Sequence, residues 1–497
     1  MKFDFLDFSW LLNNWSSEFV KQTNEVSAIN NMYEKDMGSL TVCPQIRKFS
    51  VYQASTWWAD INYVFNRKWW TLIAWYSALD WETPYYYFKW TTGSTWSSPV
   101  WIVDLTELFE PSLAEFLWKI FMVWYDYDVW DFAANRENWS TWTDNLTWMP
   151  KWKYLYVYKN KLYVCNTENW NSYIEWNNDP VAWVISWDTN VNFREFNQWD
   201  WDEITGVTEV AWKMIIFKRN SMWYWDEYES KKITDIWCIA PYSLVNIFWV
   251  AYWLSESWIF MYDWSAPVLI SRKVDKFIKQ IPWEMKITRT YAWEDRAIWV
   301  KDDFYYRLYI WTVTVDWVEY KNAWICYDTL KRSFHIRTSA NKCFFATEHK
   351  ASQDTTVAWV LYKKEWDSRA VFWTTAWYVV EFSDYWDMDS YWSKLDPVYY
   401  WVDTNELTFD NPSIVKNSPK MVIYTKNPKW MRCDIEVNSS WTYVKWETRI
   451  LNSNVEDQQL NVAWNILKIR FYWASIWEPS TLKWYTLDVK ELEERNK

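Results

Sequence analysis

The two histidines of this 497-residue chain limit the chemistry that it could support. His335 and His349 are its only imidazoles, so a Ser-His-Asp triad or a metal site with several histidine ligands is nearly excluded. His335 lies within Ser333-Phe334-His335-Ile336-Arg337, a pattern typical of a strand. We expect it to be a structural histidine rather than a catalytic base.

Two acidic clusters could serve a glycoside hydrolase, which uses two carboxylates that flank the scissile bond. They are Asp200-Trp201-Asp202-Glu203 and Asp384-Tyr385-Trp386-Asp387-Met388-Asp389. Both are typical of turns, where solvated acids are common. The second cluster could also place alternating oxygens around calcium, but it lacks a full ligand set. We therefore predict no catalytic, cofactor-binding or metal-binding residue, and no enzyme.

The cysteines and the glycine patterns indicate no cofactor. The six cysteines never form a Cys-x-x-Cys pair, so no zinc site is indicated and buried thiols are expected. No phosphate-binding glycine motif occurs at a strand-to-helix junction, even when tryptophans are read as glycines. The cysteines are Cys43, Cys165, Cys238, Cys326, Cys343 and Cys433.

The charge balance and the hydropathy bear on partners and location. The chain has 52 basic and 64 acidic residues and a net charge of -12, which argues against a nucleic-acid surface and favours protein partners. It contains no run of about 18 uncharged apolar residues, so no membrane span is predicted. The first residues, Met1–Phe5, lack the basic-then-apolar form of a signal peptide. We expect a soluble protein that is made in the cytoplasm.

Tryptophan and glycine occur in unusual amounts. There are 52 tryptophans and 3 glycines, whereas glycine is usually about 7% of a protein. Several tryptophans follow Asp or Asn, where tight hairpins favour glycine. These pairs are Asn14-Trp15, Asp80-Trp81, Asn138-Trp139, Asn169-Trp170, Asp200-Trp201, Asp263-Trp264 and Asp316-Trp317.

We interpret this pattern as glycine written as tryptophan. Thr312–Tyr320 reads as strand, turn and strand only if position 317 behaves as glycine. Some bacteria and their phages read UGA as glycine, and a codon table that reads it as tryptophan would give such a sequence. The alternative is a truly tryptophan-rich protein. The tryptophans inside apolar runs, where a large side chain packs well, are expected to be genuine: Trp75, Trp253, Trp324, Trp373 and Trp401.

A repeated unit with a period of about 40 to 50 residues runs through the middle of the chain. A turn residue precedes a short strand of β-branched, aromatic and aliphatic residues. The period is typical of a β-propeller, in which four-stranded sheets pack around an axis. We predict an all-β fold with a propeller of six to eight four-stranded blades; the alternative is an irregular β-sandwich. The strands are 71–75, 119–123, 161–164, 213–217, 259–262, 304–308 and 378–382.

The rest of the chain divides around this repeat. We predict an N-terminal arm at 1–48, the propeller at 49–390 and a small C-terminal β-sandwich-like domain at 391–497. Short strands such as Lys420–Tyr424 and Asn465–Phe471 indicate the last domain, and Lys490–Lys497 is a charged tail. Helix signals are weak throughout.

The segment from Lys153 to Ser271 resembles the propeller proteins of bacteriophage tails. Positions 201, 237, 258 and 264 must be read as glycine for this resemblance. The family's turn, strand end, loop and hairpin then follow in order at Asp202–Gly206, Phe217-Lys218, Trp237–Ser243 and Ser257–Trp264. The start Asp7-Phe8-Ser9-Trp10 is similar to that family's F-x-G-G, from which Leu11 departs. The similarity extends over residues 1 to 385.

This resemblance, which includes the tail nozzle or tubular proteins of short-tailed phages, implies a function. The protein would be a structural part of the virion, in the tail or the head-to-tail connector, and would act as a rigid assembly scaffold. Its partners would be portal, adaptor or tail subunits, and connector assemblies close as homo-oligomeric rings. The shared residues explain turns and carry no catalytic role. The alternatives are an extracellular, receptor-binding or glycan-binding propeller, and a propeller glycoside hydrolase.

Overall fold

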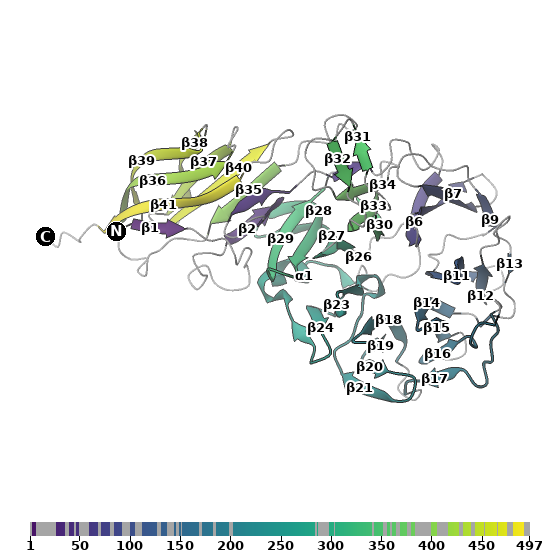
Figure 1. Ribbon diagram of the computed structural model, residues 1–497. Helices are drawn as coiled ribbons and strands as arrows, with labels where there is room; N and C mark the ends of the chain where they lie inside the picture. Colours follow the sequence, from purple (N-terminus) through teal and green to yellow (C-terminus); the bar gives the residue numbers. More distant parts are fainter. Residues whose placement is uncertain are drawn as a thin grey trace.

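The chain forms β-sheets almost throughout in a computed structural model (Figure 1). The structure describes residues 149–283 and 298–350 almost continuously and, outside these ranges, mainly strands with few of their connections. Helical segments in the described part are η3 (Pro241–Ser243), η4 (Ser271–Val274) and α1 (Asp275–Lys279). No described helix is long and apolar enough to cross a membrane. The predicted all-β fold class is confirmed.

The described strands include seven antiparallel sheets of four strands each. The first three are β6 (Ala59–Arg67), β7 (Thr71–Leu79), β8 (Pro84–Thr91) and β9 (Val100–Asp104); β10 (Ser112–Phe116), β11 (Lys119–Asp126), β12 (Asp131–Arg136) and β13 (Asp144–Asn145); and β14 (Trp152–Tyr158), β15 (Lys161–Thr167), β16 (Tyr173–Trp176) and β17 (Phe193–Glu195). The next three are β18 (Ile204–Val210), β19 (Lys213–Lys218), β20 (Met222–Trp225) and β21 (Ser230–Thr234); β22 (Val245–Ile247), β23 (Val250–Leu254), β24 (Ile259–Tyr262) and β25 (Val268–Leu269); and β26 (Ile298–Asp302), β27 (Tyr305–Val315), β28 (Val318–Asp328) and β29 (Ser333–Thr338).

The seventh sheet closes the ring with a strand from the start of the chain. It joins β30 (Cys343–Lys350), β33 (Ser368–Thr374) and β34 (Val379–Phe382) to β5 (Ile46–Lys48), whose residue Lys48 pairs with Val380. The strands β31 (Thr355–Val357) and β32 (Val360–Lys363) form a separate pair. Because β5 precedes the first sheet, hydrogen bonds as well as packing hold the last sheet to the beginning of the propeller.

The first strand of each sheet lies toward the centre of the ring. Strands β10, β14, β18, β22, β26, β30 and β6 contact one another in that order, and the sheets surround a common axis (Figure 1). Neighbouring sheets cover the second strand of a sheet on both faces, so it is apolar on both faces. In β19, for example, every residue after Lys213 is buried. The predicted β-propeller is confirmed.

The C-terminal region forms two further sheets that share one core. One sheet has the order β3 (Met32–Glu34), β4 (Leu40–Val42), β41 (Thr481–Glu491), β36 (Lys416–Lys426) and β39 (Val455–Trp464), with β1 (Lys2–Phe5) beside β41. The other has the order β2 (Val26–Asn30), β35 (Tyr399–Thr404), β40 (Ile466–Ala474), β37 (Met431–Asn438) and β38 (Tyr443–Leu451). Both sheets bury residues in the same apolar cluster, as in a β-sandwich.

The segment that we expected to be an N-terminal arm differs from that expectation. Its strands β1 to β4 belong to the two C-terminal sheets, and β5 belongs to the propeller. Ile29, Met32 and Leu40 are fully buried in the shared core. The polar residues between these positions hid the short apolar strands. Of these, β3 pairs with the neighbouring β4, whereas β1, β2 and β4 pair with strands more than 350 residues away in the sequence.

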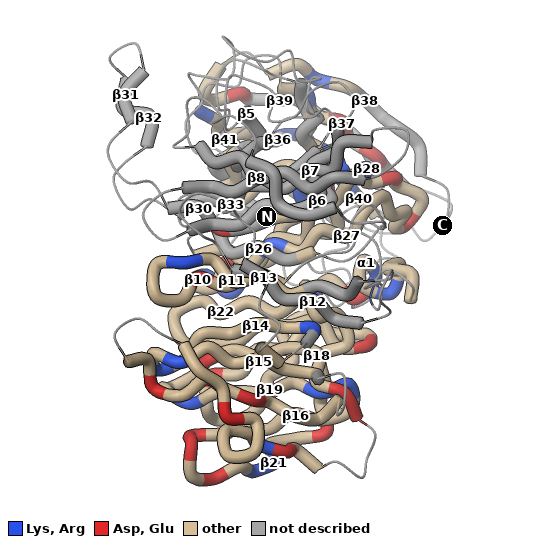
Figure 2. The backbone as a smooth tube through the Cα atoms, turned by 90° about the vertical axis from the view of Figure 1, so that its right-hand side faces the viewer, with Lys and Arg blue, Asp and Glu red and all other residues tan. Residues whose placement is uncertain are grey.

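The two parts of the molecule contact each other through the sheet β26–β29. The Asn31 backbone N–H donates to the Ile336 carbonyl at 2.8 Å, and the Asn31 side chain bonds both the backbone N–H and the hydroxyl of Thr338 at 2.7 Å. Charged residues of both signs lie on the turns of the propeller sheets (Figure 2).

Candidate functional site

The acidic segment that we considered for chemistry leads into the central strand β18. Asp202 and Glu203 immediately precede Ile204 and are almost fully buried. Asp200 and Trp201 lie outside the described residues, as does the whole second cluster at 384–389. The structure therefore tests only the second half of the first cluster.

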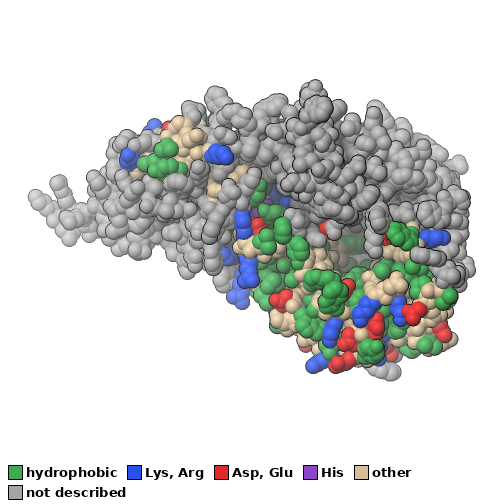
Figure 3. Space-filling view, viewed as in Figure 1, with side chains coloured by type: hydrophobic (Ala, Val, Ile, Leu, Met, Phe, Trp, Pro, Cys, Tyr) green, Lys and Arg blue, Asp and Glu red, His purple; other side chains and the backbone are tan. Residues whose placement is uncertain are grey.

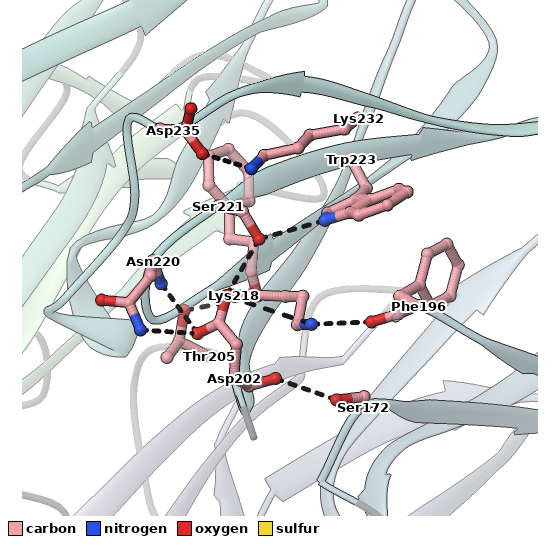
Figure 4. A network of polar contacts seen from close by, with 11 residues as sticks. Ser172, Phe196, Asp202, Thr205, Lys218, Asn220, Ser221, Trp223, Lys232 and Asp235 are labelled. Atoms are coloured by element: carbon pink, nitrogen blue, oxygen red, sulfur yellow. Dashed lines mark hydrogen bonds and ion pairs between the residues drawn. The ribbon is translucent and has the colours of Figure 1, made fainter. Parts of the chain in front are cut away.

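Asp202 holds the turn between β19 and β20 (Figure 4). Its Oδ1 accepts hydrogen bonds from the backbone N–H of Asn220 at 2.8 Å and from that side-chain amide at 3.2 Å. Its Oδ2 accepts the hydroxyl of Ser221 at 2.9 Å and lies 3.9 Å from the ammonium of Lys218. The carboxylate oxygens are thus committed to bonds within the protein, and a structural role follows.

Lys218 is fully buried between two sheets. Its ammonium donates to the Phe196 carbonyl at 2.6 Å, while Ser172 donates its hydroxyl to the Asp202 carbonyl at 3.0 Å. These bonds link the sheet β14–β17 to the sheet β18–β21. A buried ammonium is tolerated only with a counter-charge and hydrogen-bond acceptors, and Asp202 and Phe196 supply both.

Glu203 is placed differently, because its carboxylate lies closer to the surface. The ammonium of Lys153 is 3.4 Å from its Oε2, the guanidinium of Arg219 pairs with its Oε1, and the side-chain amide of Asn166 donates at 3.3 Å. The side chains of Lys153 and Arg219 are 38% and 50% exposed, against 11% for Glu203. We call these four residues the Glu203 patch; it presents hydrogen-bond donors and an acceptor close together.

A glycosidase needs a second carboxylate close to the first. The strand β18, which follows Glu203, places none beside it. The other carboxylate on this strand is Glu209, and burial raises its pKa. A strand rises about 3.3 Å per residue, so six residues place Glu209 roughly 20 Å from Glu203. The two carboxylates of a glycosidase are about 5 to 9.5 Å apart. Asp202, the nearer acid, is committed to the turn between β19 and β20.

His335 is structural, as expected from its strand context. It is buried on β29, between the rings of Tyr33 and Tyr305. Burial, followed by the charges of Arg307 and Arg337, holds its pKa well below the usual value. An imidazole that stays neutral beside two cations fits a packing role. The side chain of the other histidine lies outside the described residues.

Other predicted features of the site can be compared with the structure. All six cysteines are buried. Among the described residues, no group of His, Cys, Asp and Glu could hold a metal ion. On the face shown in Figure 3, basic and acidic side chains are mixed among hydrophobic ones. The sequence analysis missed the Glu203 patch, because Lys153, Asn166 and Arg219 are distant in sequence and only the fold brings them together.

Comparisons with known proteins indicate the fold. No model of a known protein family and no curated protein matches the chain. An exo-β-1,3-galactanase from Phanerochaete chrysosporium with galactose has 10% identity and a TM-score of 0.27, covering 90% of this chain and 100% of the other. The β-propeller domain of the Trilobed protease from Pyrococcus furiosus has 9% identity and a TM-score of 0.35, covering 65% and 99%. The extracellular domain of a putative hybrid two-component system from B. thetaiotaomicron has 8% identity and a TM-score of 0.40, covering 96% and 61%.

These findings correct two expectations. The solved structures of similar fold include several glycoside hydrolase propellers, and this finding contradicts the expectations of a virion scaffold and of a protein that is no enzyme. The phage-family turns that suggested a virion scaffold depend on the local conformational preferences of glycine, Asp and Pro, so they carry no function. At these identities the likeness shows the fold alone. The family resemblance itself, the ring assembly, the virion partners and the virion location are tested by none of these findings and stay predictions.

Proposed function

We propose that the protein is a glycan-binding β-propeller whose site is the Glu203 patch. Sugar hydroxyls both donate and accept hydrogen bonds, so a site that recognises them needs donors and acceptors within reach of one ligand. Lys153 and Arg219 supply exposed donors, and Glu203 supplies a charged acceptor. The amide of Asn166 is buried and holds Glu203 in place, because it donates to the Glu203 carboxylate and to the Ile204 carbonyl. The single observation that supports the proposal most is this combination at the surface.

The position of the patch also supports binding. Arg219 lies in the turn between β19 and β20, and Lys153 lies at the start of β14, the first strand of its sheet. Binding residues are often found on loops that a rigid scaffold positions, and the Asp202 network fixes the turn that carries Arg219. The patch therefore combines exposed side chains with a backbone held in place.

A panel of neutral and acidic oligosaccharides, immobilised and probed with the full chain, tests the proposal. We expect the Glu203→Gln variant to bind its best oligosaccharide about tenfold or more weakly, because a charge-assisted hydrogen bond is lost. Glu319→Gln is the matched control. Glu319 is a 55% exposed carboxylate that pairs with Lys321, and both residues lie on β28, away from the Glu203 patch. Equal binding by all three proteins would reject the site, and no binding by the unsubstituted chain would reject the function.

Glycoside hydrolysis is a second candidate, and one observation favours it. Burial raises the pKa of Glu175, on β16, to about 7, and its Oε2 is buried without a hydrogen-bond partner. A carboxyl group that keeps its proton near neutral pH is what a general acid requires. Release of reducing ends from the bound oligosaccharide, lost in Glu175→Gln, would support hydrolysis; binding without any release would reject it.

A further inference from the structure

Four two-residue hairpin turns share one backbone conformation. They join β10 to β11, β18 to β19, β22 to β23 and β27 to β28, and the residues that flank each turn are paired. Positive φ at both central residues defines a type I′ turn, whose twist matches that of the strands. The values are 48° and 65° at Leu117 and Trp118, 49° and 64° at Ala211 and Trp212, 50° and 67° at Phe248 and Trp249, and 49° and 67° at Asp316 and Trp317.

Tryptophan occupies the second central position of all four turns, where glycine is preferred. In the left-handed region the Cβ of any other residue approaches the following carbonyl oxygen, which strains the backbone. Burial gives little compensation, because the exposed fractions are 97% for Trp317, 69% for Trp212, 49% for Trp118 and 47% for Trp249. Two of the rings, Trp212 and Trp249, contact each other at 4.5 Å between centroids. Residue type and conformation conflict at each turn.

A fifth turn, which joins the first two strands of its sheet as three of these four turns do, provides an internal comparison. Lys159 and Asn160 join β14 to β15 with φ of 42° and 60°, and the flanking Tyr158 and Lys161 are paired. Asparagine is among the few residues other than glycine that adopt the left-handed conformation routinely. The second central residue of this turn is therefore one that suits the left-handed conformation, unlike the tryptophans of the other four turns.

Other tryptophans divide according to backbone conformation. Trp264, with φ of 82°, follows Asp263, and Trp311, with φ of 69°, lies at an irregularity in the pairing of β27 with β28. Bulges of this kind favour glycine. Trp253 and Trp324 are instead fully buried inside strands and do not have positive φ. Positive φ thus separates Trp264 and Trp311, which are partly buried, from Trp253 and Trp324.

We propose that the natural protein carries glycine at positions 118, 212, 249 and 317, because its source reads as glycine the codon that is written there as tryptophan, whereas Trp253 and Trp324 are genuine. The totals of 52 tryptophans and 3 glycines in the chain agree with such a reading. One consequence concerns ligands. The exposed indoles at these hairpins are then no aromatic platform for a sugar, and each hairpin presents a bare tight turn.

Peptide mass spectrometry of the protein purified from its source tests the proposal directly. The spectra are searched with glycine and with tryptophan at the four turn positions, and Trp253 and Trp324 serve as controls in the same digest. We expect glycine at the turns and tryptophan at the controls. Tryptophan at the turns would overturn the proposal, and glycine at the controls would overturn the division by backbone conformation.

Recombinant chains give a second readout that does not depend on the source. Glycine at all four turns is compared with alanine at all four, because alanine removes the indole but keeps the Cβ. We expect the glycine chain to melt about 4 °C higher than the alanine chain. Equal melting temperatures would show that the turns do not select against a Cβ and would overturn the argument. If the alanine chain fails to fold, folding of the glycine chain alone supports it.

Discussion

The two ends of the sheet β18–β21 are built in opposite ways. At one end, Asp202 and Lys218 are buried and bonded to neighbouring backbone and side-chain groups. At the other end, the turn Ala211–Trp212 projects an indole that is 69% exposed, and both turn residues have positive φ. The conformation of that second turn requires positive φ, and its contacts are the Tyr158 hydroxyl on the Trp212 carbonyl and the ring of Trp249 on the Trp212 indole.

This difference determines what a substitution does at each end. At the end that contains Asp202 and Lys218, charge and hydrogen bonding determine which residue types fit, and most substitutions destabilise the folded protein. At the turn Ala211–Trp212, the positive φ favours a residue without a Cβ, so a substitution by glycine stabilises the folded protein. The predictions below test this contrast from the largest expected effect to the smallest.

Replacing Asp202 should have the largest effect. Asp202→Asn keeps the shape of the side chain but leaves the buried Lys218 ammonium without its counter-charge, so we expect the free energy of unfolding to fall by about 3 kcal/mol. Asp235→Asn is the matched control, because Asp235 is 80% exposed and pairs with Lys232 on the same sheet. Urea denaturation measures both. Equal losses in the two variants would show that the Asp202 network adds nothing specific.

The adjacent sheet sharpens the contrast, because its buried carboxyl group, Glu175, lacks a partner for Oε2. Burial raises its folded pKa to about 7, above the ordinary value of 4.5. Below pH 4.5 both states hold the proton; between 4.5 and 7 only the folded state does, so stability falls as pH rises. We expect Glu175→Gln to be about 2 kcal/mol more stable above pH 7 and to show no such gain below pH 4.5, allowing for partial exposure.

Denaturation at several pH values checks that window for Glu175→Gln. Glu229→Gln, on an exposed turn of the sheet β18–β21, is the control variant measured beside it. A gain that is the same at pH 4 and pH 8 would mean that Gln improves packing, and the titration argument would fail.

The turn at the other end of β18–β21 should respond in the opposite direction to Asp202. We expect Trp212→Gly to raise the free energy of unfolding by about 1 kcal/mol, because the left-handed strain disappears. Trp212→Ala keeps the Cβ and also loses the ring contact with Trp249, so it should give no gain. Thermal unfolding of the two variants decides; a larger gain for alanine than for glycine would contradict the role of φ.

The sequence predicted the all-β propeller because its period is local. Five of the seven predicted strands are second strands of their sheets, namely β7, β11, β15, β19 and β27, and the other two, β24 and β34, are third strands. Second strands are easy to find because they are buried on both faces and follow a tight turn. The distances in sequence between the predicted strands were irregular because two of these strands, β24 and β34, are third strands and not second strands.

Long-range pairing and the site could not be predicted in this way. Strands β1, β2 and β4 are short and pair across most of the chain, so no local pattern marks them. Glu203 was noticed as an acid, but its partners Lys153 and Arg219 come from two different sheets. Their roles depend on burial, and burial follows from the three-dimensional arrangement. Positions that need a residue tolerant of positive φ were easier to predict, since φ in a two-residue turn depends on the local sequence.

The smallest effect on stability is expected at Arg219, and it separates scaffold from binding site. Arg219 is 50% exposed, and an exposed ion pair contributes about 0.5 kcal/mol or less. We expect Arg219→Ala to unfold almost as the unsubstituted chain does, yet to bind its oligosaccharide several-fold more weakly. Denaturation and glycan binding of the same preparation measure both. A loss of stability as large as that of Asp202→Asn would make Arg219 part of the scaffold, and the Glu203 patch would then have no side chain whose main role is at the surface.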